Sequence, residues 1–143
     1  RAFATTPGHA ELIFTLRAEH ESDMQMLADA ALALVNSVSD EHGLTCETEW
    51  TEEFTATVNT PACADVVRTA ANKLMLQTTE LGQPFRWSED FGYITAAAPG
   101  ALLGLGAGKD CPALHNPNYD FPDEITPAGV DMLLMIINET LNA

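Results

Sequence analysis

Residues 101–117 read ALLGLGAGKDCPALHNP and join a short apolar run to a glycine-rich loop and a histidine. The apolar run from Ala101 to Leu105 is bounded by glycines, which is typical of a buried strand. Ligands of α/β proteins gather beyond the carboxyl ends of their strands. His115, which follows this strand and its loop, is therefore a candidate functional residue.

Two other segments alternate apolar and polar side chains with the period of a strand, residues 11–17 and residues 44–58. Apolar residues at helical spacing predict four helices between and after the strands. Their expected starts are a capping box at Ser22, Thr60 with Pro61, Ser88, and Thr126 with Pro127, and the first is expected to end at Gly43. Strands and helices in this order predict an α/β fold. A boundary between two structural pieces is expected at residues 58–61.

Composition excludes several classes of protein. The 143 residues carry 21 acidic and 6 basic side chains, a net charge of −15, which repels nucleic acid and anionic membranes. No apolar run is long enough to cross a bilayer, and no segment resembles a signal peptide. The three cysteines, Cys46, Cys63 and Cys111, form no disulfide or CxxC pattern. We expect reduced thiols and a cytoplasmic protein.

The glycine-rich loop does not have the spacing of a nucleotide site. A phosphate-binding loop ending in Gly108-Lys109 requires glycine where Leu103 stands and Ser or Thr where Asp110 stands. A plain tight loop is the better interpretation. Cys111 lies four residues before His115 and is a possible second metal ligand, but Pro112 leaves no helix to fix that spacing.

Several short motifs follow one another in a distinctive order in the second half of the chain. They are Arg86-Trp87-Ser88-Glu89-Asp90-Phe91, Pro99-Gly100-Ala101, residues 103–108, Leu114-His115-Asn116-Pro117 and Tyr119-Asp120-Phe121. The series resembles the C-terminal portion of the M20 metallopeptidase and amidohydrolase family, in its aminoacylase, hippurate hydrolase and auxin-conjugate hydrolase branch. The chain also opens on Arg1 without a methionine, so we expect it to be part of a longer protein.

The resemblance implies a two-part enzyme. Residues 1–59 would be part of a lid that forms a homodimer, and residues 60–143 the C-terminal part of a catalytic domain. The family's divalent metal ions, two of Zn, Mn or Co, would activate water to cleave the amide bond of an N-acyl amino acid or small peptide. His115 matches one metal ligand. The other ligands and the general base are expected upstream, so no catalytic residue is assigned here and the chain alone is expected to be inactive.

Three residues match family positions and are candidates for contact with substrate. Arg17 could bind a carboxylate or be a surface arginine, Asn59 could contact substrate or form a turn, and Glu89 could face the site or stabilise a helix start. Before residue 11, relatives often carry Asn-Val-Ile-Pro-Asp, whereas this chain has only the proline of that motif, in Ala4-Thr5-Thr6-Pro7-Gly8. Two alternatives remain, a di- or tripeptidase of the same family and a non-catalytic binding or assembly module.

Overall fold

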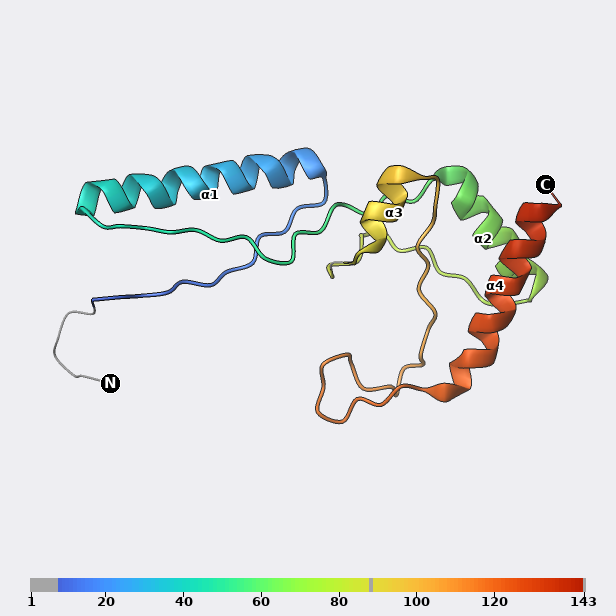
Figure 1. The fold of residues 1–143 in the computed structure, drawn as a ribbon. Coiled ribbons are helices and arrows are strands. Elements are labelled where there is room, and N and C mark those ends of the chain that lie inside the picture. Colours follow the sequence, from blue (N-terminus) through green and yellow to red (C-terminus); the bar gives the residue numbers. More distant parts are fainter. Residues whose placement is uncertain (1–7, 88, 143) are drawn as a thin grey trace. The chain divides into compact units, whose positions relative to one another are not determined.

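The computed structural model describes residues 8–87 and 89–142 and is helical (Figure 1). The chain divides into two compact units, Arg1–Thr51 and Glu52–Ala143. Among the described residues the first unit contains one helix, and the second contains three α-helices and one short 3-10 helix. The elements are α1 (Glu21–His42), α2 (Pro61–Lys73), α3 (Phe91–Ala97), η1 (Asp123–Ile125) and α4 (Thr126–Leu141).

The predicted α/β fold is wrong. No residue within 8–87 or 89–142 belongs to a strand, and Figure 1 shows the predicted strands 11–17, 44–58 and 101–105 as irregular chain. Alternation of apolar and polar residues indicates only which side chains share a face. A strand also requires a ladder of backbone hydrogen bonds to a neighbouring strand, and no such ladder forms in the described part of the chain. The described chain consists instead of helices joined by long irregular segments.

In the first unit, helix α1 is set by its two ends. It begins one residue before the predicted capping box, with His20 at the N-cap, so that Ser22 lies inside the helix and the capping box is wrong. The predicted end at Gly43 is confirmed. Gly43 has a φ of 63°, and the N–H of Leu44 donates to the carbonyl of Ser39 at 2.8 Å. A left-handed residue with this bond is a Schellman ending, which glycine adopts without steric strain.

In the second unit, α2 and α4 pack against each other around three buried residues. Ala70, Ala71 and Met132 are at most 4% exposed and form the centre of the core. The two alanines present almost no side chain, so the backbones can approach and the flexible Met132 fills the space between them. Six partly buried side chains surround this centre, Val67, Leu74, Leu76, Leu103, Met135 and Ile136.

The predicted helix starts are mostly close to the observed ones. Thr60 at the N-cap and Pro61 at the first position of α2 are confirmed. Thr126 is itself the first residue of α4, because η1 runs directly into that helix. The start predicted at Ser88 lies outside the described residues, and α3 begins at Phe91. Glu89 and Asp90 therefore precede α3 and do not form its first turn.

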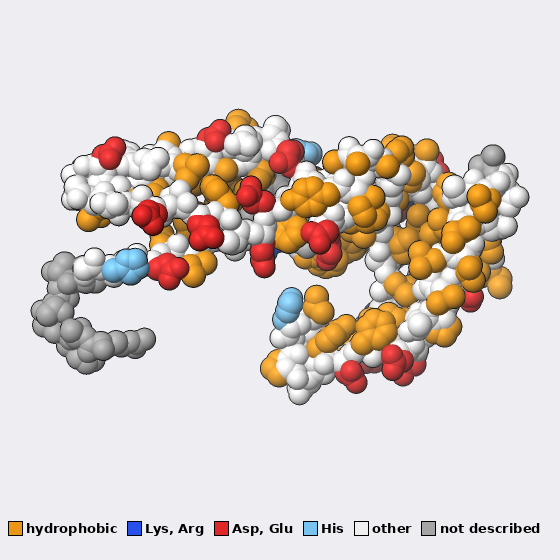
Figure 2. Space-filling view, in the orientation of Figure 1, with side chains coloured by type: hydrophobic (Ala, Val, Ile, Leu, Met, Phe, Trp, Pro, Cys, Tyr) orange, Lys and Arg blue, Asp and Glu red, His pale blue; other side chains and the backbone are white. Residues whose placement is uncertain are grey.

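Much apolar surface is exposed. Large hydrophobic side chains of both units are more than half exposed, among them Leu12, Ile13 and Met75. Helix α4 is apolar on a second face as well as on its core face, and Figure 2 shows hydrophobic side chains over it. The side chains of this second face are Val130, Leu133, Leu134, Ile137 and Leu141, all half exposed or more. No helix in the described residues is both long and apolar enough to cross a membrane.

Candidate functional site

His115 lies on an exposed turn in the second unit. The N–H of Asn116 donates to the carbonyl of Ala113 at 3.0 Å, and the N–H of Tyr119 donates to the carbonyl of Asn116 at 2.9 Å, so two turns follow each other. The side chain of Asn116 accepts a further bond from the N–H of Asn118 at 2.9 Å. His115 has a φ of 69°, a left-handed conformation that is uncommon for residues other than glycine and asparagine. The turn presents its imidazole to solvent.

The described residues do not supply a complete metal site. No three His, Cys, Asp or Glu side chains among them converge on a common point. A zinc ion takes about four ligands, so one imidazole does not hold it. The possible second ligand, Cys111, is a free, partly buried thiol that contacts the carbonyl of its neighbour Pro112 at 3.6 Å. The imidazole of His115 can therefore serve as one ligand only in a larger set.

Asn59 joins two segments that are far apart in the sequence. Its side-chain amide donates to the carbonyl of Leu102 at 2.9 Å, and its side-chain oxygen accepts from the N–H of Leu102 at 2.8 Å. The next residue repeats the pairing, because the N–H of Thr60 donates to the carbonyl of Gly100 at 2.8 Å and its hydroxyl accepts from the N–H of Gly100 at 3.3 Å. Four hydrogen bonds thus fix the start of α2 to residues 100–102.

Glu89 is exposed and lies two residues before the start of α3. Its carbonyl accepts a long bond, 3.4 Å, from the N–H of Gly92, and the carbonyl of Asp90 accepts from the N–H of Tyr93 at 3.0 Å. Asp90 occupies the N-cap position but makes no side-chain capping bond. The backbone of Glu89 is therefore held by the first turn of α3, and its side chain extends from that turn into solvent.

Arg17 belongs to the first unit, in the irregular segment before α1. Its side chain is exposed and has an interaction partner in the structure. Asn59, Glu89 and His115 all belong to the second unit. Among these three, hydrogen bonds tie Asn59 to residues 100–102 and Glu89 to α3, and His115 lies on a separate turn. The assignment of the four residues to substrate and metal stays a prediction.

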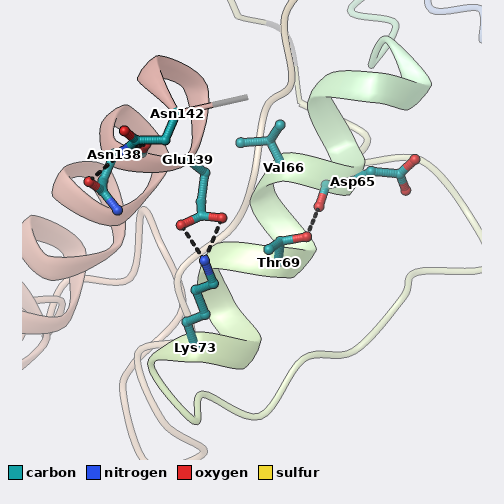
Figure 3. A pocket seen from close by; sticks show the side chains of 7 residues that line it. All are labelled: Asp65, Val66, Thr69, Lys73, Asn138, Glu139 and Asn142. Atoms are coloured by element: carbon teal, nitrogen blue, oxygen red, sulfur yellow. Dashed lines mark hydrogen bonds and ion pairs between the residues drawn. The ribbon is translucent and has the colours of Figure 1, made fainter.

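An open cleft of about 360 Å³ lies between α2 and α4 and contains none of the predicted site residues (Figure 3). Lys73 donates to both carboxylate oxygens of Glu139 at 2.7 Å across this cleft. This pair links the two helices. The cleft is lined by Asp65, Val66, Thr69, Lys73, Asn138, Glu139 and Asn142.

A second ion-pair cluster lies on the exposed side of α2. Arg68 donates to Glu80 at 2.7 Å and to Asp65 at 2.6 Å, and the hydrogen bond to Glu80 is the main cause that raises the pKa of the Arg68 guanidinium. Arginine is protonated at every physiological pH, so this pair adds no pH dependence in that range. Both partners are exposed, and their role is to tie the segment after α2 to the helix.

Two residues that the sequence did not single out contact the segment before α2. Gly92 is buried and its backbone lies against Thr55, and the hydroxyl of Tyr93 donates to the carbonyl of Glu53. A sequence signal existed for Gly92. Glycine inside a helix lowers its stability by about 1 kcal/mol relative to alanine, so its presence there indicates a close backbone approach.

Comparison with known proteins extends over almost the whole chain. The model of peptidase family M20/M25/M40 matches residues 2–139, which include the loop of His115 and nearly all of α4. The Bacillus subtilis protein named "Putative amidohydrolase YhaA" is 28% identical over 127 residues, which are 85% of this chain and 32% of that protein. The N-acetyldiaminopimelate deacetylase of Exiguobacterium sibiricum is 24% identical over 130 residues, 88% of this chain and 34% of the enzyme.

A third relative, an uncharacterized hydrolase of Staphylococcus haemolyticus, is 25% identical over 129 residues, 87% of this chain and 34% of its own length. The chain thus spans about a third of the length of the curated relatives it matches. No solved structure matches it significantly. The resemblance expected from the ordered motifs is confirmed by the family match, and the chain belongs to peptidase family M20/M25/M40.

Proposed function

We propose that this chain forms part of a metal-dependent amidohydrolase that cleaves the amide bond of N-acyl amino acids. The observation that carries the proposal is the family match over residues 2–139, because it includes every motif from Arg86 to the last helix. Two relatives support the chemistry by name, one an amidohydrolase and one a deacetylase of an N-acetylated amino acid. An acyl group on the amino nitrogen of an amino acid forms an amide bond, so both names refer to hydrolysis of an amide.

Within this function His115 would be one ligand of a divalent metal ion, zinc, manganese or cobalt. Its exposed position on a turn supports the assignment, because an exposed imidazole can be approached by ligands from another part of the protein. A bound divalent metal supplies a Lewis acid for amide hydrolysis. The remaining ligands and the general base would come from outside residues 1–143.

Arg17, Asn59 and Glu89 are proposed to contact the substrate. Arg17 carries the charge and planar geometry that suit a carboxylate. Asn59 uses one amide hydrogen and one acceptor lone pair on Leu102, which leaves a second donor and a second lone pair for a substrate. Glu89 exposes its carboxylate beside the first turn of α3.

The wider organisation is part of the same proposal. Residues 1–59 would belong to a lid through which two copies dimerise, and residues 60–143 to the catalytic domain. The division into compact units Arg1–Thr51 and Glu52–Ala143 supports a two-part chain. Three free cysteines are compatible with the reducing conditions of a cytoplasmic location.

The experiment is hydrolysis by the longer protein that contains this chain, assayed on N-acetyl amino acids beside di- and tripeptides. Faster hydrolysis of the acyl amino acids, its loss with a chelator and its recovery with Zn²⁺, Mn²⁺ or Co²⁺ are the expected results. His115→Ala should lower both bound metal and activity, whereas His9→Ala is a matched control on an exposed histidine of the first unit. Full activity and metal content in His115→Ala would refute the ligand assignment.

The alternative within the family is a peptidase, which the family description itself favours. Preferential cleavage of di- or tripeptides in the same assay would establish it. A protein that hydrolyses none of these amides with any of the three metals would instead be a non-catalytic member.

A further inference from the structure

We propose that Gly92 and Tyr93 are positioning residues, which hold the turn of Glu89 and Asp90 against residues 53–55. The inference rests on the proposed function only for its effect on substrate, because the contacts themselves are independent of it. The clamp defined by Gly92, Tyr93, Glu53 and Thr55 lies within the second unit.

Gly92 allows the two segments to touch. A Cβ atom built on Gly92 would lie 2.2 Å from the carbonyl oxygen of Thr55 and 3.0 Å from its carbonyl carbon. Both are backbone atoms, so a side chain could not be accommodated by a rotamer change and the segments would have to separate. The close approach therefore requires glycine at position 92, although glycine weakens a helix.

Tyr93 holds the segments together. Its hydroxyl donates to the carbonyl of Glu53, although the tyrosine side chain is about half exposed. Residues 53–55 lie in irregular chain without a ladder of their own, so this bond gives one of their backbone acceptors a partner.

The contact is transmitted to Glu89 by the backbone. The N–H groups that donate to the carbonyls of Glu89 and Asp90 are those of Gly92 and Tyr93. A helix of seven residues, such as α3, is too short to be stable by itself. Anchoring Gly92 and Tyr93 therefore holds the turn in front of the helix, and with it the backbone position from which the Glu89 side chain extends.

Residues 53–55 lead directly to a second fixed point. Asn59 and Thr60 are hydrogen-bonded to Leu102 and Gly100, just beyond the end of α3. The segment from residue 53 to residue 60 is thus held at both ends, once by the first turn of α3 and once by the chain that leaves it. This arrangement keeps Asn59 and the Glu89 turn in a constant relation.

The test uses Tyr93→Phe and Gly92→Ala in the longer protein, with matched controls. Gly82→Ala adds the same Cβ at a glycine with open space around it, and Thr140→Val removes a hydroxyl that donates to the carbonyl of Ile136 inside α4. Hydrogen exchange of the amides of residues 91–95 reports on the clamp without requiring activity. We expect hydrogen exchange to be about fivefold faster in Tyr93→Phe, which is the factor that one modest hydrogen bond contributes. The increase in the exchange rate should be larger in Gly92→Ala, and the rate should not change in the two controls.

The second measurement separates positioning from folding. Loss of folded protein lowers the apparent kcat without changing KM, whereas a displaced substrate-binding carboxylate raises KM. We expect Tyr93→Phe to raise KM about fivefold and Gly92→Ala to reduce kcat/KM on the order of a hundredfold, as a misplacement of about 1 Å can do. In a Glu89→Gln background, Tyr93→Phe should raise KM no further, because the two changes act on one contact.

Unchanged hydrogen exchange in Tyr93→Phe would refute the proposal that the clamp holds residues 91–95. Additive effects of Tyr93→Phe and Glu89→Gln on KM would refute the proposal that the clamp acts on substrate through Glu89. If the wild-type protein hydrolyses none of the amides tested, the proposed function fails, and the positioning role fails with it. The exchange data would still show in that case whether the clamp exists, so the two failures are distinguishable.

Discussion

Within residues 8–87 and 89–142, Met132 is the only large side chain of the core that is almost fully buried, and Met132→Ala tests how the second unit is held together. The side chain is 4% exposed and contacts Ala70 and Ala71 from the facing helix. Truncation removes Cγ, Sδ and Cε from this contact. At about 0.8 kcal/mol for each group of this size, the lost transfer free energy is about 2.4 kcal/mol. The cavity left between two alanines, which have no side chain to fill it, brings the expected loss to about 2–5 kcal/mol.

The matched control is Leu133→Ala, one position further along α4. Leu133 is 61% exposed on the second apolar face, so its truncation should change the free energy of unfolding by less than about 1 kcal/mol. The assay is urea unfolding of residues 1–143 followed by circular dichroism at 222 nm. Equal losses for the two variants would refute the reasoning, because they would mean that the packing of α2 on α4 does not determine stability.

Four further predictions follow from single contacts. Asn59→Ala removes two exposed hydrogen bonds to the backbone of Leu102 and should lower the free energy of unfolding by about 0.5–1.5 kcal/mol; an unchanged melting temperature would contradict the bidentate pairing. Lys73→Met should lower the free energy of unfolding by about 1 kcal/mol in low salt and by less in 1 M NaCl, because Lys73 is half exposed although Glu139 is not. A loss of stability that does not depend on salt would indicate that the packing of the Lys73 side chain, and not its charge, is responsible. Met75→Gly should stabilise the chain by about 0.5–1 kcal/mol, since Met75 is 92% exposed with a φ of 55°, and a lower melting temperature would argue against strain there. Residues 1–143 with added Zn²⁺ should hydrolyse no N-acetyl amino acid, as one imidazole at His115 cannot hold the ion, and turnover by the purified chain would contradict this.

Several features could be predicted because their causes are local. Gly43 ends α1 since glycine alone enters the left-handed region freely, and Pro61 starts α2 since its fixed φ suits the first helical position. The order of motifs around His115 identified the family, because those residues occur at fixed places along the chain. Such signals need only a few neighbouring residues, so no knowledge of the tertiary structure was required.

The strands could not be predicted correctly, because a strand depends on a partner that the pattern of one segment does not contain. Residues 44–58 alternate as a strand would, yet the hydrogen bonds that form near their end involve the side chain of Asn59 and the backbone of Leu102. The left-handed φ of His115 was equally hidden, since it belongs to the third position of the turn that the N–H of Asn116 closes on the carbonyl of Ala113.

By itself, the sequence determined the end of α1 at Gly43 and the start of α2 at Pro61, which residues carry the family's motifs, and that the chain is strongly acidic. Only the tertiary structure decided which apolar face of α4 is buried, because Met132 and Leu133 are alike in hydrophobicity and differ only in whether Ala70 and Ala71 lie opposite. It also decided why position 92 is glycine. The reason is a backbone atom of Thr55, 37 residues earlier in the chain, which occupies the space where a side chain would lie.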